Sequence, residues 1–139
     1  MSGFWWAVCA AVVWGIVPFL EKAGLSGTKP LTGVFYRSLG VALGLIVLFP
    51  FFVKPDQVRS VDFRSSVLIM LGGFLASIVG QIFFYHGLKT GEVSRMVLIA
   101  GSYPFITFLL GVCFLHESFT LHKGLGGALI LAGLWLLKS

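Results

Sequence analysis

A stripe of polar side chains interrupts one otherwise apolar stretch of the sequence and offers hydrogen-bonding chemistry. Gln81, Tyr85 and Lys89 are spaced four residues apart, so on a helix they share one face, with Gly80 beside them. The amide and the phenol supply donors and acceptors, and the lysine adds a charge near one end. We interpret this stripe as the wall of a polar cavity, although a glutamine in such a stretch can instead bond to a neighbouring helix. His86 points about 100° away from Tyr85 and is predicted to pack against another helix.

Arg37 is the most costly polar residue in the apolar stretches. It lies seven residues after Pro30, and a charged side chain at the centre of a membrane helix costs about 2.5–3.5 kcal/mol on insertion scales. One interpretation is a contact with an anion or carboxylate in a polar cavity. The other is a side chain that extends to lipid headgroups, about 10 Å away along the helix. The sequence favours neither.

Two proline breaks lie close to aromatic side chains. Trp14 lies deep in the first apolar stretch and Pro18 follows one turn later, while Tyr103 directly precedes Pro104. Each proline frees a carbonyl group, which must find a new donor or line a cavity. The indole of Trp14 is suited to form a flat wall for an apolar or aromatic solute. Broken helices are typical of transporter binding sites, and kinks without function are also common.

The acidic residues and the absence of motifs argue against catalysis. No HExxH, GxSxG, Gly-rich phosphate loop or Asp-rich metal motif occurs in the sequence. The five acids lie at the ends of apolar stretches or between them, so obligatory proton coupling through a carboxylate deep in the membrane is disfavoured. Coupling through Glu21, Glu117 or His86 near a boundary stays open. The sequence predicts no enzyme, catalytic residue, metal or cofactor.

Five apolar stretches must hold these residues in place. They are Phe4–Leu20, Leu31–Val53, Ser65–Leu88, Val93–Leu115 and Phe119–Leu137. A helix that spans a membrane needs about 20 mostly apolar residues. The chain has 58% hydrophobic and only 11% charged residues, whereas charged residues make up roughly 25% of an average soluble domain. Continuous apolar runs exclude a barrel, whose strands alternate. We therefore predict an all-α polytopic membrane protein, a bundle of five transmembrane helices in one domain of residues 1–139.

The fifth stretch is the least certain span, because His122 and Lys123 lie near its start. Small residues at helical spacing predict close helix packing in three stretches. These are Gly40 with Gly44, then Gly72, Ala76 and Gly80, and finally Gly124, Ala128 and Ala132.

The basic residues are divided almost evenly between the two sides of the membrane. Five spans place the following four on the N-terminal side: Lys54, Arg59, Arg64 and Lys123. The opposite side carries Lys22, Lys29, Lys89, Arg95 and Lys138. Arg37 lies about two helical turns into the second span, counted from that same side. Cytoplasmic loops normally carry a clear excess. Either a marginal bias orients the chain, or it inserts both ways and pairs with an inverted copy. Because the basic residues are single, nucleic acid is not a predicted partner.

Taken in order, several short pieces of the chain match one known repeat. They begin with Trp14-Gly15, Lys22, Arg37 and Gly80, and continue with YHGLK (85–89), Ser94, SYPFITFLLG (102–111), FLHESFT (114–120) and GLGGALILAG (124–133). In this order and spacing, the chain resembles a single EamA repeat of the drug/metabolite transporter superfamily.

The resemblance implies a secondary transporter, an exporter or exchanger of small metabolites or drug-like solutes that works by alternating access. Typical members carry two inverted repeats in ten helices, so a single repeat implies an antiparallel homodimer. By analogy the cavity is formed by Trp14, Arg37, Gln81, Tyr85 and Tyr103, and Glu117 holds the turn between spans four and five. The expected location is the cell (inner or plasma) membrane, with lipids and a small solute as partners. The alternatives are a flippase subunit, or an accessory half of a split ten-helix carrier.

Overall fold

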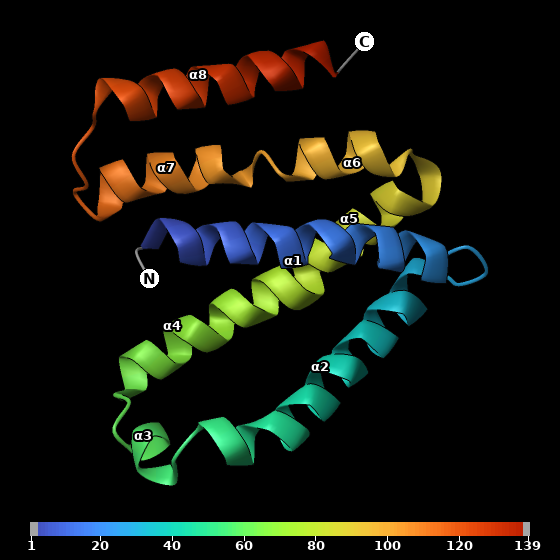
Figure 1. Cartoon of the computed structure of the whole chain (residues 1–139), viewed down its shortest axis with the longest axis vertical. Coiled ribbons are helices and arrows are strands. Elements are labelled where there is room, and N and C mark those ends of the chain that lie inside the picture. The colour runs from blue at the N-terminus through green and yellow to red at the C-terminus, as the bar shows by residue number, and fades with distance from the viewer. Residues whose placement is uncertain (1–2, 138–139) are drawn as a thin grey trace. The chain divides into compact units, whose positions relative to one another are not determined.

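The structure is a computed structural model that describes residues 3–137, and every regular element in that range is helical (Figure 1). The elements are α1 (Gly3–Gly24), α2 (Pro30–Phe52), α3 (Pro55–Arg59), α4 (Phe63–Phe74), the π-helical turn η1 (Leu75–Val79), α5 (Gly80–Thr90), α6 (Val93–Ala100), α7 (Tyr103–Phe114) and α8 (Leu121–Leu136). They form two compact units, Met1–Thr90 and Gly91–Ser139. The predicted all-α membrane architecture is confirmed.

In the first unit, α1 and α2 are followed by the continuous helix α4–η1–α5. Figure 1 shows α2 and α4 spread apart near α3, whereas α2 and α5 approach each other at their other ends. Both α2 and α3 begin with proline. Proline suits this position because an N–H group in the first turn has no acceptor within the helix, so its absence costs no hydrogen bond. Asp62 precedes α4 and accepts a hydrogen bond from the Ser65 main-chain N–H at 2.9 Å, which satisfies one of the free donors of the first turn.

The π turn η1 determines which way the following helix faces. The main-chain N–H of Gly80 donates to the carbonyl of Leu75, five residues earlier. A Cβ at position 80 would lie 3.2 Å from that carbonyl oxygen, so glycine suits the wide turn. One extra residue rotates the face of the next helix by about 100°. The directions of Gln81 and Tyr85 therefore depend on η1, and such turns are frequent at functional sites.

In the second unit, one apolar span is broken into α6 and α7. The Gly101 N–H donates to the Val97 carbonyl at 2.7 Å and the Ser102 N–H donates to the Ile99 carbonyl at 3.2 Å, so the helix tightens and stops. Pro104 has no N–H with which to continue it. A Cβ at position 101 would lie 2.8 Å from the Val97 carbonyl oxygen, which makes glycine necessary there. Of the two expected proline breaks, the one at Pro104 is present, immediately before Tyr103, whereas α1 continues through Pro18.

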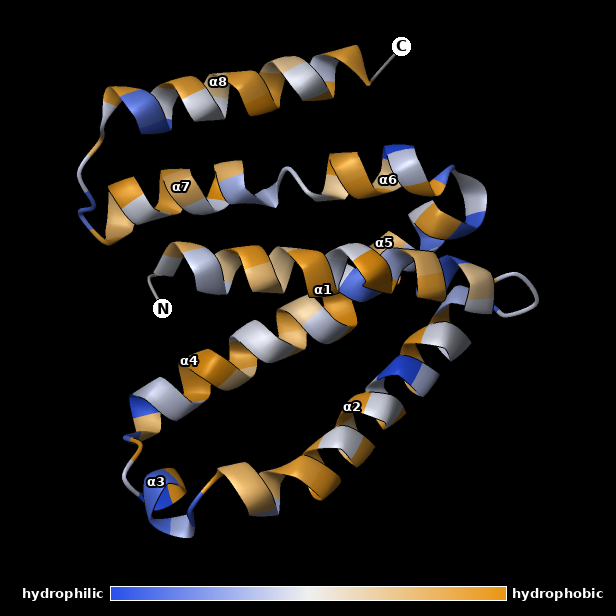
Figure 2. Ribbon diagram, in the orientation of Figure 1, coloured by the Kyte–Doolittle hydropathy of each residue, from blue (hydrophilic) through white to orange (hydrophobic). Residues whose placement is uncertain are grey.

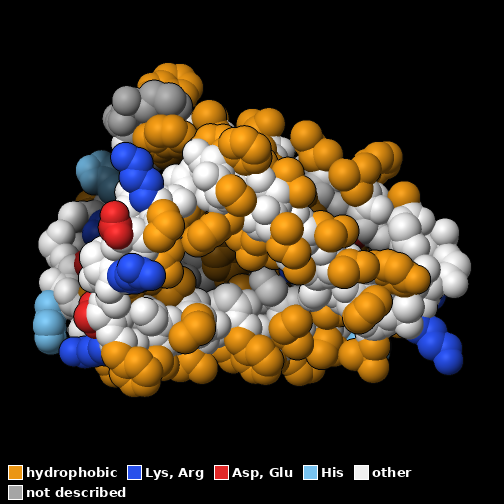
Figure 3. All heavy atoms as spheres, turned by 90° about the horizontal axis from the view of Figure 1, so that it is seen from below, with side chains coloured by type: hydrophobic (Ala, Val, Ile, Leu, Met, Phe, Trp, Pro, Cys, Tyr) orange, Lys and Arg blue, Asp and Glu red, His pale blue; other side chains and the backbone are white. Residues whose placement is uncertain are grey.

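Four helices are long and apolar enough to cross a membrane, and a fifth is shorter. The four are Gly3–Gly24, Pro30–Phe52, Phe63–Thr90 and Val93–Phe114, and the shorter one is Leu121–Leu136. Figure 2 shows hydrophobic residues along most of each long helix and hydrophilic ones at α3 and near helix ends. On the face in Figure 3, hydrophobic side chains cover most of the surface and charged ones lie toward its ends. The protein is a multi-pass membrane protein.

The predicted boundaries differ from the observed ones at two informative places. The first helix continues to Gly24 instead of ending at Leu20, so Glu21 belongs to the helix rather than to the connection after it. The polar connection 54–64 contains the short helix α3. The first difference arises because the polar residues after Leu20 continue the helix, and the second because Pro55 begins a separate short helix after Lys54.

Three glycines of the predicted small-residue stripes have no close neighbour within the first unit. Apart from the helix's own backbone, no atom lies within 4 Å of a Cβ built at Gly40, Gly44 or Gly72. Close contacts occur at other glycines instead: Gly33 meets Tyr85, and Gly127 meets Phe105. In the third stripe, a Cβ built at Gly124 would lie 2.7 Å from the Phe119 ring. Close helix packing at the three stripes therefore stays a prediction, because spacing identifies a helix face but not the neighbour that covers it.

Candidate functional site

A carboxylate at the centre of a polar cluster joins three helices of the first unit. Glu21 Oε1 accepts a hydrogen bond from Gln81 Nε2 at 3.0 Å and an ion-paired hydrogen bond from Arg37 Nε at 3.2 Å. Tyr85 is a further neighbour of the Glu21 carboxylate. The Glu21 side chain is 10% exposed and that of Arg37 is 29% exposed. This polar cluster, Glu21, Arg37, Gln81 and Tyr85, is the candidate functional site.

Each member of the polar cluster is placed by a different local feature. Glu21 lies in the last turn of α1, and the main-chain N–H of Leu25 still donates to its carbonyl at 2.9 Å. Arg37 lies about two turns into α2, which reverses the chain direction after a short connection. Gln81 and Tyr85 follow the π turn and lie one turn apart in α5.

The few buried side chains of the first unit surround the polar cluster. Leu25, Val34, Tyr85 and Leu88 form its buried hydrophobic core, and Gln81 is the buried polar residue of the described chain. Gly33 allows α2 to approach α5, because a Cβ there would lie 2.7 Å from Leu25 Cδ2 and 2.9 Å from the Tyr85 ring. Close apolar packing at Gly33 therefore limits the positions open to the Tyr85 ring.

Two lysines connect the C-terminal ends of α1 and α5. The Lys22 ammonium group donates to the carbonyl of Leu88. Lys89 Nζ donates to the carbonyls of Leu25 at 2.7 Å and Ser26 at 3.0 Å. Each lysine thus donates to main-chain carbonyls at or just after the C-terminal end of the other helix, where positive charge is favourable. The two helices end on the same side, with basic groups above the polar cluster.

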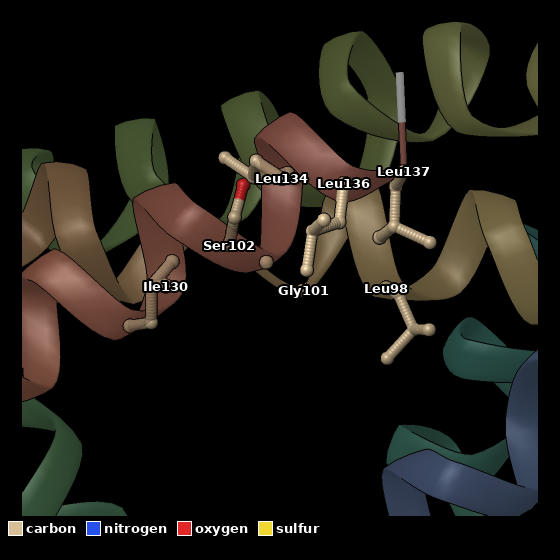
Figure 4. Close-up of a pocket in the computed structure, with 8 residues that line it drawn as sticks. Leu98, Gly101, Ser102, Ile130, Leu134, Leu136 and Leu137 are labelled. Atoms are coloured by element: carbon tan, nitrogen blue, oxygen red, sulfur yellow. The ribbon is translucent and has the colours of Figure 1, made fainter. Parts of the chain in front are cut away.

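The second unit contains an apolar pocket at its broken helix. Its volume is about 450 Å³, and it is lined by Leu98, Gly101, Ser102, Ile130, Gly133, Leu134, Leu136 and Leu137. Figure 4 shows Ser102 as the polar side chain among leucine and isoleucine groups from α6 and α8. With so few polar groups, this pocket can accommodate hydrocarbon but cannot fix the orientation of a polar solute.

The turn between α7 and α8 is held by an acidic residue. Lys123 Nζ donates to Glu117 Oε2 at 3.4 Å, and the Glu117 main-chain N–H donates to the Gly111 carbonyl at 3.2 Å. His116 takes the left-handed backbone conformation, with φ of 53°. The expected role of Glu117 in holding this turn agrees with these contacts.

Comparison with known proteins assigns the chain to a family. The EamA-like transporter family matches residues 1–139. The chain belongs to this family. The family is part of the drug/metabolite transporter superfamily, and it consists of membrane transporters of small solutes rather than enzymes.

Relatives of this EamA-like chain come from archaea, bacteria and plants. It is 27% identical over 131 residues to an uncharacterized protein of Methanocaldococcus jannaschii, which covers 92% of this chain and 90% of that protein. It is 29% identical over 136 residues to an uncharacterized transporter of Haemophilus influenzae, covering 98% of this chain and 44% of the relative. It is also 29% identical over 126 residues to a WAT1-related protein of Arabidopsis thaliana, covering 87% of this chain and 35% of the relative. No solved structure matches the chain.

The EamA-like chain brings together three of the five residues that the sequence assigned to the cavity. Arg37, Gln81 and Tyr85 meet at Glu21. Trp14 lies on α1 with 63% of its surface exposed, and Tyr103 belongs to the second unit with 55% exposed. Solute binding by any of these five residues stays a prediction.

One side chain behaves differently from the sequence-based interpretation, and a second agrees with one of its two alternatives. His86 does not pack against another helix: it is exposed, and its Nδ1 lies 2.8 Å from the Ile82 carbonyl of its own helix. For Arg37 the structure agrees with the first of the two interpretations, a contact with a carboxylate in a polar cluster, because its Nε meets Glu21 Oε1 at 3.2 Å instead of extending to headgroups. Glu21 is the cluster member that sequence reasoning missed. The sequence did contain a signal for this pair: Glu21 and Arg37 carry opposite charges and lie on either side of the short connection between α1 and α2.

Proposed function

We propose that this EamA-like protein is a secondary transporter of small metabolites or drug-like solutes. It exports or exchanges them by alternating access, as an antiparallel homodimer of inverted five-helix units. The observation that carries the proposal is the buried polar cluster around Glu21, inside the spanning helices of a chain that matches a transporter family over its whole length.

The polar cluster supports a solute path because its residues are expensive at membrane depth. Polar and charged side chains in spanning helices usually face a cavity or one another and mark substrate or ion pathways. Here three helices each contribute, and the π turn before Gln81 gives α5 a local irregularity from which its angle can change. A solute that interacts with Gln81 or Tyr85 would therefore act on the contacts between α1, α2 and α5.

Three observations support a second, inverted copy. The chain aligns with less than half of the Haemophilus influenzae transporter, as expected for one repeat of two. Its basic residues are divided nearly evenly between the two sides, which permits both insertions. Only 6% of each candidate spanning window is buried, so long apolar helix faces are available to lipid and to a partner. An inverted pair would have its two-fold axis in the membrane plane.

Transport is tested in proteoliposomes with a panel of radiolabelled metabolites and fluorescent drug-like compounds. We expect an outwardly directed gradient of the unlabelled solute, or of protons, to drive accumulation of at least one labelled solute by exchange. Gln81→Ala removes a donor to Glu21 and should abolish this flux. His86→Ala is the matched control on the same helix, because its side chain is exposed and bonds only to its own helix. Undiminished flux in the Gln81 variant would place the path elsewhere, and absence of flux for the whole panel would remove the transport proposal.

The inverted pair is tested by labelling single cysteines from outside intact cells. Gly27→Cys and Ser60→Cys lie in exposed connections on opposite sides, in a background where Cys9 and Cys113 are replaced by alanine. Dual insertion labels part of the population at each position, and crosslinks should form between copies. Exclusive labelling at one position contradicts the homodimer. If flux then requires a second protein, the chain is half of a split carrier, an alternative that its short coverage of the longer relatives favours.

A further inference from the structure

Two neighbouring side chains of α2 have hydrogen-bonding groups without partners. Among the described residues, the buried side-chain atoms that lack a partner are Nη1 of Arg37 and Oγ of Ser38. The Arg37 guanidinium group meets Glu21 through Nε. A buried donor that has lost its water and has no other partner destabilises the folded state, the more so on a charged group. This part of the polar cluster therefore lacks a hydrogen-bond acceptor.

Glu21, in contrast, already has its donors. Its Oε1 accepts from both Arg37 and Gln81, and Tyr85 lies beside it. A cationic solute that bound to Glu21 would have to displace these donors and leave Arg37 without its counter-charge. The group that completes the cluster is therefore an acceptor rather than a donor.

The charges around the polar cluster also favour an anion. Arg37, Lys22 and Lys89 are basic, and Glu21 is the acidic member of the polar cluster. The Arg37–Glu21 distance of 3.2 Å is longer than the roughly 2.7–2.9 Å of strong charge-assisted hydrogen bonds. Glu21 meets Arg37 through Nε, so Nη1 is left for a second anion.

We infer that Arg37 binds the carboxylate of a small solute, and this rests on the proposed transport function. The planar guanidinium fork matches two carboxylate oxygens, which a lysine ammonium group cannot do. Arg37 is part-exposed at 29%, so a solute can reach the guanidinium group and draw Nη1 into a hydrogen bond. A singly charged carboxylate lowers the excess positive charge with little repulsion from Glu21, whereas a doubly charged phosphate would repel the Glu21 carboxylate more strongly.

The test is ligand-induced thermal stabilisation of the purified full chain in detergent, at constant ionic strength. Sodium benzoate is compared with benzamide, benzylamine and inorganic phosphate, because benzamide has a similar shape without the charge. A ligand that binds only the folded protein raises its apparent stability. We expect benzoate to raise the melting temperature in a concentration-dependent way and the other three compounds to leave it unchanged.

Variants assign the effect to Arg37. Arg37→Gln should abolish the benzoate shift, and Arg37→Lys should reduce the shift while keeping the charge and the fold. Lys29→Gln is the matched control, because Lys29 is exposed and outside the polar cluster, and it should keep the full shift. An equal shift in Arg37→Gln, a shift with phosphate alone, or no shift with benzoate in the unaltered protein would each overturn the inference.

Binding and transport fail in distinguishable ways. If the benzoate shift depends on Arg37 but no solute crosses proteoliposomes, the carboxylate site stands and the transport function falls. If a neutral or cationic solute is transported while benzoate has no effect, transport stands and the carboxylate site falls.

Discussion

Replacing Glu21 by glutamine removes the negative charge from the centre of the polar cluster while keeping its shape. The Arg37 and Gln81 donors then face a neutral carbonyl in place of a carboxylate. Hydrogen bonds to charged groups contribute about 1.5–3 kcal/mol and neutral ones about 0.5–1.5 kcal/mol, so two weakened bonds lose about 2–3 kcal/mol together. Little of this is screened, because the Glu21 side chain is only 10% exposed.

The second ion pair of the described chain supplies the control. Glu117 and Lys123 are 54% and 41% exposed and their charged atoms lie 3.4 Å apart, and exposed pairs contribute about 0–1 kcal/mol. Reversible unfolding in mixed micelles measures both variants as a change in the free energy of unfolding. Glu21→Gln should cost at least 1 kcal/mol more than Glu117→Gln. Equal costs would show that the Glu21 cluster is solvated and does not hold three helices together.

Three further perturbations probe the same unit by unfolding and exchange measurements. Gly33→Ala forces a Cβ to within 2.9 Å of the Tyr85 ring and should lower the free energy of unfolding by about 1–3 kcal/mol. Gly40→Ala is the control, because the space around Gly40 is open, and it should leave stability unchanged or slightly raised. Equal effects of the two variants would mean that α2 does not pack closely on α5. Lys89→Met removes the donor to two carbonyls and should cost about 1.5–3 kcal/mol, with faster amide exchange at the end of α1; unchanged exchange there would contradict the connection. The Ser65 N–H holds the pKa of Asp62 below its usual 3.8, so the Asp62 carboxylate stabilises the start of α4 above that pH and this contribution is lost as pH falls through the lower folded-state pKa. Protection of the Ser65 amide should fall in that acidic range, and an Asp62→Ala variant that keeps the same acid dependence would refute the cap.

Much of the fold follows from local sequence. Apolar runs of spanning length give helices because lipid leaves the main chain no other hydrogen-bond partners, and the observed helices lie close to those runs. The break before Tyr103 follows from Pro104, whose ring removes a donor from the helix. Spacing along one helix also placed Gln81 and Tyr85 on a common face, which is the face that meets Glu21.

The sequence was least informative where two segments must be placed together. Glu21 looked like a boundary residue because the apolar run ends at Leu20, yet the helix continues and its side chain meets α2 and α5. The stripe Gly40 and Gly44 has no close neighbour in its unit, whereas the isolated Gly33 has one. Neither outcome can be read from spacing, since packing depends on the register between helices.

The sequence by itself showed that the protein lies in a lipid bilayer, where its apolar helices begin and end approximately, and which family it belongs to. Each of these depends on residue types along a single segment. Only the tertiary structure decided that Arg37 pairs with Glu21, that two lysines connect α1 to α5, and that a π turn aims Gln81 into the polar cluster. The physical reason is that a hydrogen bond between helices needs a register and a rotation that no single segment specifies. Those two quantities are fixed by packing around Gly33 and Tyr85.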